Sequence, residues 1–278
     1  MKNIISIAIA FLFIQVGIAQ SKAIKTEVIG KGKPILFLPG FTTPGEVWKE
    51  TVQHLTTQKE SHLISYAGFN GIKSIEMPWY AGIKKEIIAY VKDNNLKDLE
   101  IIGHSMGGTL AVDIAAELPN RVKKVILVDA LPCMREVMMP GVPAESLQYE
   151  SPYNKQMLEM DDDQFKGMAS MMATNMTNSK HNIARVTQWI LEADRTTYVY
   201  GYTDLLKLDL RSQLLKIKAE VLVLAAPTYG DIGKQNMEKQ YVNLTNKIIE
   251  MAPNSKHFIM LDQPEWFYKK VNSFLTSE

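Results

Sequence analysis

Residues 103–107, Gly-His-Ser-Met-Gly, are the part of this chain best suited to nucleophilic chemistry. A mostly apolar run, 99–102, precedes them, and a run of small and apolar residues, 109–116, follows. Gly-x-Ser-x-Gly between a strand and a helix places the serine on a tight turn, with its hydroxyl projecting above the sheet. The free N–H groups and the dipole at the start of the helix favour negative charge there. The spacing therefore predicts that Ser105 is a nucleophile.

A serine hydroxyl attacks a carbonyl poorly unless a base removes its proton, and histidine is the usual base. Among the five histidines, His257 lies in a predicted loop between the last strand and the last helix. That loop and Ser105 are expected at the same edge of the sheet. His54 and His62 are expected to have packing or surface roles. We therefore predict that His257 is the general base.

An acid must hold such a base in the correct tautomer, and two aspartates follow strands at this edge. Asp129 directly follows the apolar run 125–128. Asp231 follows the run 221–226, the strand after which this chemistry most often keeps its acid, but it comes later in its loop. Asp129 has the cleaner position at a strand end and is slightly preferred, and both aspartates remain candidates.

Attack by Ser105 would create an oxyanion, which two preorganised donors must stabilise. The backbone N–H of Met106, directly after the nucleophile, is one expected donor. The N–H of Phe41 is the other, because Pro39-Gly40 turns the chain at the end of the first long apolar run. These donors complete a predicted site for acyl transfer.

The elements that must position these residues are short, continuous apolar runs that alternate with helical patterns. Such runs are typical of strands that are buried on both faces of a parallel sheet. The alternation predicts an α/β fold with helices on both faces and a ligand site at the carboxyl ends of the strands. The predicted strands are 23–30, 34–38, 61–67, 99–102, 125–128, 221–224 and 248–251.

Between residues 132 and 217 the continuous apolar runs disappear and the pattern becomes helical. We predict a helical cap over 132–217, inserted into a core formed by 20–131 and 218–278. Methionine at helical spacing often fills cores, but it also adapts to varied apolar ligands, so some of these methionines are hypothesised to line an acyl pocket. They are Met134, Met138, Met139, Met157, Met160, Met168, Met171, Met172 and Met176.

The first 19 residues read as a secretory signal peptide, with a basic start, an apolar run over 4–16 and small residues at 17–19. We predict cleavage near Ala19 and a secreted or periplasmic enzyme. The apolar run is shorter than the roughly 20 residues that a membrane-spanning helix needs, so no stable span is expected after cleavage.

The amino-acid composition excludes several other classes of function and site. The chain has 278 residues, enough for one large α/β domain with an insertion, and its net charge of +1 gives no indication of a nucleic-acid partner. The single cysteine, Cys133, excludes an internal disulfide. The acidic run 161–163 lacks the glycine and glutamate of a calcium loop and is interpreted as a helix start. Neither a metal nor a cofactor is expected.

Together these motifs resemble the α/β-hydrolase superfamily over nearly all of the chain that follows the signal peptide. The resemblance implies an eight-stranded sheet, a cap and a Ser-His-Asp triad in the chain order serine, acid, histidine. Two features depart from the family: the oxyanion turn begins with Pro39 rather than histidine, and the strand ending at Ala226 lacks Gly-x-x-Asp, which leaves the acid open. The matching segments are 37–41, 103–108, 127–129, 221–224, 257–258 and 262–264.

The expected function is that of a serine hydrolase that cleaves an ester or similar small acyl substrate, of apolar character, through an acyl-enzyme. An aminopeptidase, a lactonase or a thioesterase would use the same residues. A non-catalytic receptor that keeps the hydrolase fold is the alternative from a different class, since fold alone does not determine function.

Overall fold

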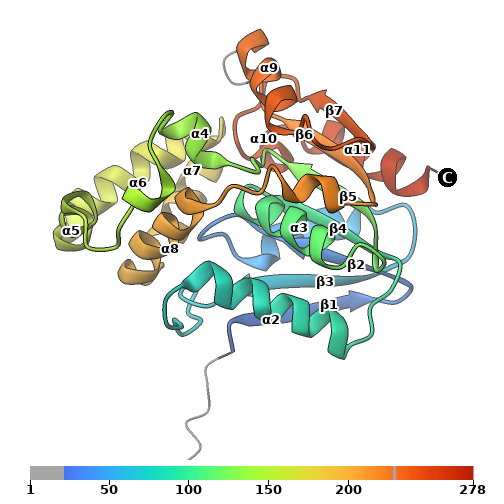
Figure 1. Ribbon diagram of the computed structural model, residues 1–278, viewed down its shortest axis with the longest axis horizontal. Helices are drawn as coiled ribbons and strands as arrows, with labels where there is room; N and C mark the ends of the chain where they lie inside the picture. Colours follow the sequence, from blue (N-terminus) through green and yellow to red (C-terminus); the bar gives the residue numbers. More distant parts are fainter. Residues whose placement is uncertain (1–21, 228–229, 278) are drawn as a thin grey trace, which may run out of the picture.

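A seven-stranded sheet in the order β1-β3-β2-β4-β5-β6-β7 forms the centre of the computed structural model (Figure 1). The structure describes residues 22–227 and 230–277, without the side chains of 230–232, so the predicted signal peptide lies outside the described residues. All neighbouring strands are parallel except β1, which runs antiparallel to β3. The strands are β1 (Ile24–Gly30), β2 (Lys33–Leu38), β3 (Lys59–Tyr66), β4 (Leu99–His104), β5 (Val122–Val128), β6 (Glu220–Ala225) and β7 (Lys247–Met251).

The sheet confirms the predicted α/β class but corrects the number of strands. The resemblance implied eight, whereas the described residues form seven, one for each apolar run in the sequence. A single strand, β1, precedes β2 in the described chain, and it pairs with β3 and ends the sheet there. The eighth strand was therefore an expectation from the family that the described residues do not contain.

Side chains of the central strands alternate between two apolar cores, one on each face of the sheet. Leu36 and Leu38 of β2 point into the core under α2 (Trp79–Asp93) and α3 (Met106–Glu117), whereas Ile35 and Phe37 point into the core under η1 (Gly45–Trp48) and α11 (Pro264–Thr276). These side chains are fully buried, as the continuous apolar runs predict. The helices are α1 (Lys49–Gln53), α2 (Trp79–Asp93), α3 (Met106–Glu117), α4 (Met134–Met138), α5 (Pro152–Glu159), α6 (Asp162–Met176), α7 (Lys180–Leu191), α8 (Arg195–Lys207), α9 (Gly230–Gln240), α10 (Ile259–Asp262) and α11 (Pro264–Thr276), with 3₁₀ turns η1 (Gly45–Trp48), η2 (Ala144–Ser146) and η3 (Gln213–Lys216).

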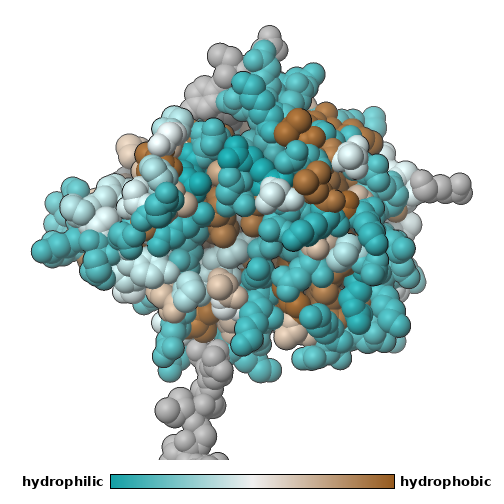
Figure 2. All heavy atoms as spheres, in the orientation of Figure 1, coloured by the Kyte–Doolittle hydropathy of each residue, from teal (hydrophilic) through white to brown (hydrophobic). Residues whose placement is uncertain are grey.

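The chain between β5 and β6 is helical, which is consistent with the predicted insertion over 132–217. Its helices α5 to α8 lie together to one side of the sheet, beyond the ends of the central strands (Figure 1). Phe165 and Trp189 are buried within it, and hydrophilic side chains dominate its surface on the face shown in Figure 2. Within 22–227 and 230–277, no helix combines the length and the apolar character that crossing a membrane requires.

Candidate active site

Ser105 occupies a sharp turn between the end of β4 and the start of α3. Its backbone has φ 53° and ψ −122°, in the left-handed half of conformational space that non-glycine residues rarely adopt. A Cβ on Gly103 would lie 2.3 Å from the carbonyl oxygen of Gly107, and a Cβ on Gly107 would lie 2.1 Å from the carbonyl oxygen of Leu38. Side chains at either glycine would therefore open the turn that presents the Ser105 hydroxyl.

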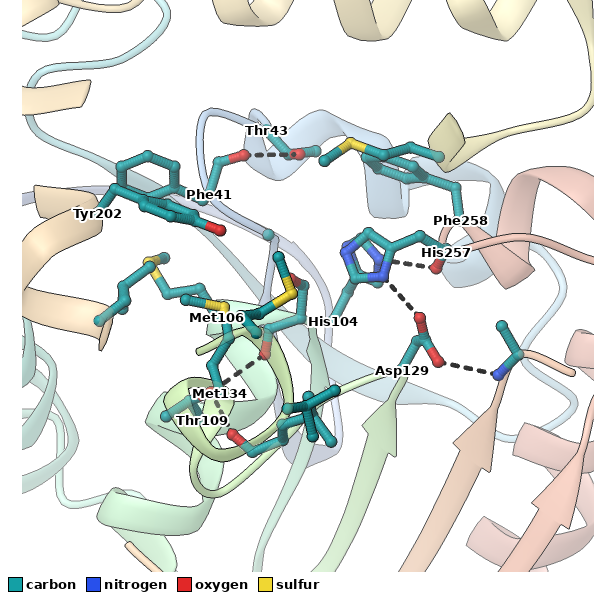
Figure 3. A pocket seen from close by; sticks show the side chains of 18 of the residues that line it. Phe41, Thr43, His104, Met106, Thr109, Asp129, Met134, Tyr202, His257 and Phe258 are labelled. Carbon is teal, nitrogen blue, oxygen red and sulfur yellow. Dashed lines mark hydrogen bonds and ion pairs between the residues drawn. The ribbon is translucent and has the colours of Figure 1, made fainter. Parts of the chain in front are cut away.

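Asp129 and His257 form a short hydrogen bond at the same edge of the sheet. Asp129 directly follows β5, and His257 lies in the loop between β7 and α10. The Nδ1 atom of His257 lies 2.6 Å from Oδ2 of Asp129, while Oδ1 of Asp129 accepts a hydrogen bond of 2.9 Å from the N–H of Ala226 (Figure 3). Both carboxylate oxygens are thus fixed, and the arrangement leaves Nε2 of His257 as the ring atom free to take a proton.

The two candidate acids differ in their placement. Asp129 bonds to His257, whereas Asp231 falls in the first turn of α9, where its side chain is outside the described part of the structure. The distance to the imidazole therefore favours Asp129 as the acid partner of His257.

Ser105 and His257 line one cavity of about 370 Å³ between the sheet and the helices that follow β5. Phe41 and Met106, whose N–H groups were the predicted oxyanion donors, line it as well. As the first residue of α3, Met106 has an N–H without an acceptor inside the helix. Among the described residues, no hydrogen bond joins the Ser105 hydroxyl to the His257 imidazole; such contacts often tighten only in the complex with substrate.

The walls of the cavity are mostly apolar. Four of the nine methionines in the predicted insertion line it, together with Tyr198 and Tyr202 of α8 and Met237 of α9. Neither lysine nor arginine occurs among the described lining residues, and Asp129 is the one carboxylate there. The four methionines are Met134, Met138, Met172 and Met176.

Phe41 connects the cavity wall to the predicted oxyanion turn. Its ring makes edge contacts with Phe69 and Trp79, at centroid distances of 4.9 and 5.5 Å, and tilted contacts with Tyr198 and Tyr202 of α8, at 5.7 and 5.9 Å. Figure 3 shows Phe41 and Tyr202 side by side at the cavity. Helix α8 thus touches the side chain of a residue whose backbone is expected to bind the oxyanion.

His104, which the sequence places in the turn beside Ser105, has a fully buried ring in this site. Its Nε2 atom lies 3.0 Å from the carbonyl oxygen of His257. Burial lowers the pKa of His104 well below its ordinary value of 6.5, and the neighbouring His257 lowers it further, so the ring is neutral. Sequence spacing gave no sign of this contact, because the two histidines are 153 positions apart.

The described residues contain no group of three or more His, Cys, Asp or Glu side chains arranged to hold a metal ion. The acidic run at 161–163 begins α6 instead. Asp161 caps the helix by accepting a hydrogen bond of 2.8 Å from the N–H of Gln164, whose side chain accepts one of 3.2 Å from the N–H of Asp161.

Comparisons with known proteins agree with the fold. Among curated relatives, pimeloyl-[acyl-carrier protein] methyl ester esterase of Aeromonas hydrophila is 23% identical, covering 91% of this chain and 99% of the relative. N-formylmaleamate deformylase of Pseudomonas putida is 21% identical, covering 88% and 90%. The solved esterase EaEST of Exiguobacterium antarcticum superposes with a TM-score of 0.77 at 18% identity, covering 92% and 98%. The family model described as alpha/beta hydrolase fold matches residues 33–276, and this chain therefore belongs to the α/β-hydrolase family.

Proposed function

We propose that this protein is a serine hydrolase that cleaves an ester of a small, uncharged, apolar acyl group. The observation that carries the proposal is the 2.6 Å contact between Asp129 and His257, beside the strained turn that presents Ser105 to the same cavity. Nucleophile, base and acid come from three separate segments that follow strands β4, β7 and β5, and together they make the set of groups that acyl transfer through a serine uses.

In the first half-reaction, Nε2 of His257 takes the proton of the Ser105 hydroxyl as its oxygen attacks the carbonyl carbon. Asp129 holds the imidazole through Nδ1 and stabilises the imidazolium that forms. The N–H groups of Phe41 and Met106 donate to the developing oxyanion. The intermediate then collapses: the bond to the alcohol breaks, and the alcohol leaves with the proton from His257.

The second half-reaction repeats these steps with water. His257 takes a proton from the water, whose oxygen attacks the acyl-enzyme, and the same two N–H groups bind the oxyanion. The bond to Ser105 breaks and its oxygen recovers the proton from His257. The products are a carboxylic acid and an alcohol, and every group needed is a side chain or peptide of this chain.

The lining of the cavity supports an uncharged substrate. A carboxylate next to the reacting carbonyl would be buried without a cationic partner, because no lysine or arginine lines the described walls. An aminopeptidase would need a carboxylate for the substrate's ammonium group, and Asp129 already bonds to His257. The methyl ester in the name of the Aeromonas relative is a substrate type that fits an apolar cavity of about 370 Å³. Lactones and thioesters remain alternative acyl substrates.

The proposal includes a cap and export. The segment 132–217 is the cap, because its helices supply the methionine and tyrosine walls above the nucleophile. The N-terminal segment 1–19 directs export and is removed. N-terminal sequencing of the protein expressed in a bacterium with a periplasm should give Gln20 as the first residue of the periplasmic form. A chain that keeps Met1 and stays in the cytoplasm would contradict export.

The test is a panel of p-nitrophenyl esters of increasing acyl length, run beside p-nitroanilides, lactones and thioesters. The highest kcat/KM is expected for an uncharged ester, with weaker turnover of an ester that carries a carboxylate on its acyl chain. The variant Ser105→Ala in the same preparation controls for contaminating esterases. Binding of esters without any turnover would favour the receptor alternative and contradict the proposal.

A further inference from the structure

The imidazole of His104 lies at the meeting point of three loops that are distant in sequence. It is the last residue of β4, directly before the turn of Ser105, and its ring centroid lies 4.6 Å from that of His257 and 4.6 Å from that of Phe258. On another side it faces Gly40, where an added Cβ would lie 2.8 Å from Nδ1 of His104. The ring therefore touches the nucleophile turn, the loop of the base and the predicted oxyanion turn.

The hydrogen bond of His104 has a defined direction. The partner of Nε2 is the backbone carbonyl of His257, 3.0 Å away, and a carbonyl only accepts, so Nε2 carries the proton and donates. Nδ1 is then a bare lone pair, buried and without a partner among the described residues. The neutral ring thus uses its one N–H to hold the residue that carries the base.

His257 needs such a contact because it lies on a loop rather than on a strand or helix. Two neighbouring bonds also hold this loop: the N–H of Phe258 donates to the carbonyl of Met176, and the N–H of Lys256 donates to Oδ2 of Asp262. These bonds tie the loop to the end of α6 and to α10. The bond from His104 differs, since its donor is the residue directly before Ser105.

We propose that His104 is a positioning residue, which sets the distance between Ser105 and the imidazole of His257 by donating from Nε2 to the His257 carbonyl. The inference builds on the proposed function of Ser105 and His257. His104 ends β4 and Ser105 follows it directly, so a fixed distance between Nε2 of His104 and the His257 carbonyl also fixes the path along which a proton moves from the Ser105 hydroxyl to the His257 imidazole. Small displacements along such a path reduce the rate strongly.

The proposal is tested with two variants that separate the ring from its N–H. His104→Phe keeps an aromatic ring but removes the donor, whereas His104→Gln keeps an N–H donor at about the position of Nε2. His104→Phe is expected to lower kcat by about 10- to 100-fold with little change in KM. The rate at which a fluorophosphonate labels Ser105 should fall by a similar factor, and His104→Gln should recover much of both rates.

His62→Phe is the matched control, because His62 is also a buried histidine with a hydrogen bond from its ring but does not line the cavity. It should leave kcat and the labelling rate at the wild-type values. If His104→Phe does not fold, as judged by circular dichroism, His104→Asn replaces it, since its shorter side chain places the amide too far back to reach the His257 carbonyl. His104→Asn should then be slower than His104→Gln.

Wild-type rates in His104→Phe, or equal losses in the phenylalanine and glutamine variants, would overturn the inference, as would His104→Asn as fast as His104→Gln. Wild-type rates in His104→Phe would mean that the hydrogen bond from His104 is not needed for catalysis. The other two results would mean that position 104 contributes only by filling space. Different results would contradict the proposed function itself. In that case Ser105→Ala would retain turnover, or the fluorophosphonate would not react with Ser105 of the wild-type protein, and neither result depends on the residue at position 104.

Discussion

The catalytic rim and the insertion hold their side chains in different ways. The catalytic rim, defined as the proposed catalytic residues Ser105, Asp129 and His257 with the proposed positioning residue His104, is fixed by two hydrogen bonds to backbone, by the bond between Asp129 and His257, and by a turn that Gly103 and Gly107 allow. The predicted insertion, 132–217, meets the same cavity with methionine and tyrosine side chains. The hydroxyl of Tyr198 donates a hydrogen bond of 3.3 Å to the sulfur of Met172, which joins two side chains of that segment rather than a side chain and the backbone of a strand. Under the proposed function, the catalytic rim would carry out the chemistry, and the insertion would select the acyl group that reaches it.

The largest expected effect comes from removing the nucleophile or the base. Ser105→Ala and His257→Ala should each lower kcat for esters by about 10⁴-fold or more, and the double variant should lose little further activity, because the two groups act as a unit. Steady-state kinetics with an ester substrate measure this, and circular dichroism checks the fold. Additive losses would mean that the two side chains do not act in one proton transfer.

The next effect separates the two acids. Asp129→Asn should lower kcat by about 10³- to 10⁴-fold, because the amide favours the wrong tautomer of His257. Asp231→Asn is the matched control and should leave kcat unchanged. A larger loss of kcat in Asp231→Asn than in Asp129→Asn would assign the acid to Asp231. It would contradict the assignment made from the Asp129–His257 contact.

A smaller effect is expected when the insertion is changed. Replacing Met134 and Met172 with alanine should enlarge the cavity and shift the preferred ester toward longer acyl chains, changing the ratio of kcat/KM for long and short esters by about tenfold. Met171→Ala is the control, since its side chain is 62% exposed and does not line the cavity. An unchanged preference for acyl-chain length in the double variant would show that these methionines do not determine substrate selectivity.

The smallest expected effect is on the pH dependence of folding stability, and it depends on His104. Burial lowers the folded-state pKa of His104 well below 6.5, so below pH 6.5 the unfolded chain binds a proton that the folded chain does not. Stability contributed by neutral His104 is therefore present above pH 6.5 and lost as the pH falls. His104→Gln removes this titration and should flatten the dependence of unfolding free energy on pH by up to about 1.4 kcal/mol per pH unit.

Urea unfolding of the wild-type protein and His104→Gln, measured across the mildly acidic range, tests the expectation. Equal slopes in the two proteins would show that His104 does not titrate differently in the folded and unfolded states.

The local features of the fold could be predicted from sequence, because their causes are local. Glycine at 103 and 107 predicts the tight turn, and continuous apolar runs predict strands buried on both faces, since each strand packs against helices on two sides. The acidic run at 161–163 was interpreted correctly as a helix start, and Asp161 caps α6. The eight-stranded sheet was wrong, because it came from the family rather than from an apolar run in this chain.

Features that depend on loop conformation could not be predicted in this way. Asp129 and Asp231 both follow strands at one edge, and only the path of the loop carrying His257 brings one carboxylate to 2.6 Å from its ring. The ring of His104 is buried by Gly40 and Phe258, which lie in loops far from it in sequence. The spacing of residues along the chain does not predict such contacts between loops.

Covalent labelling tests the central claim most directly. The wild-type protein is treated with a fluorophosphonate, and the adduct is counted by intact mass and located by peptide mapping, with His257→Ala and Asp129→Asn treated in parallel. The account predicts one adduct per chain, on Ser105, formed far more slowly in both variants. No adduct, an adduct on another residue, or wild-type labelling rates in the variants would contradict it.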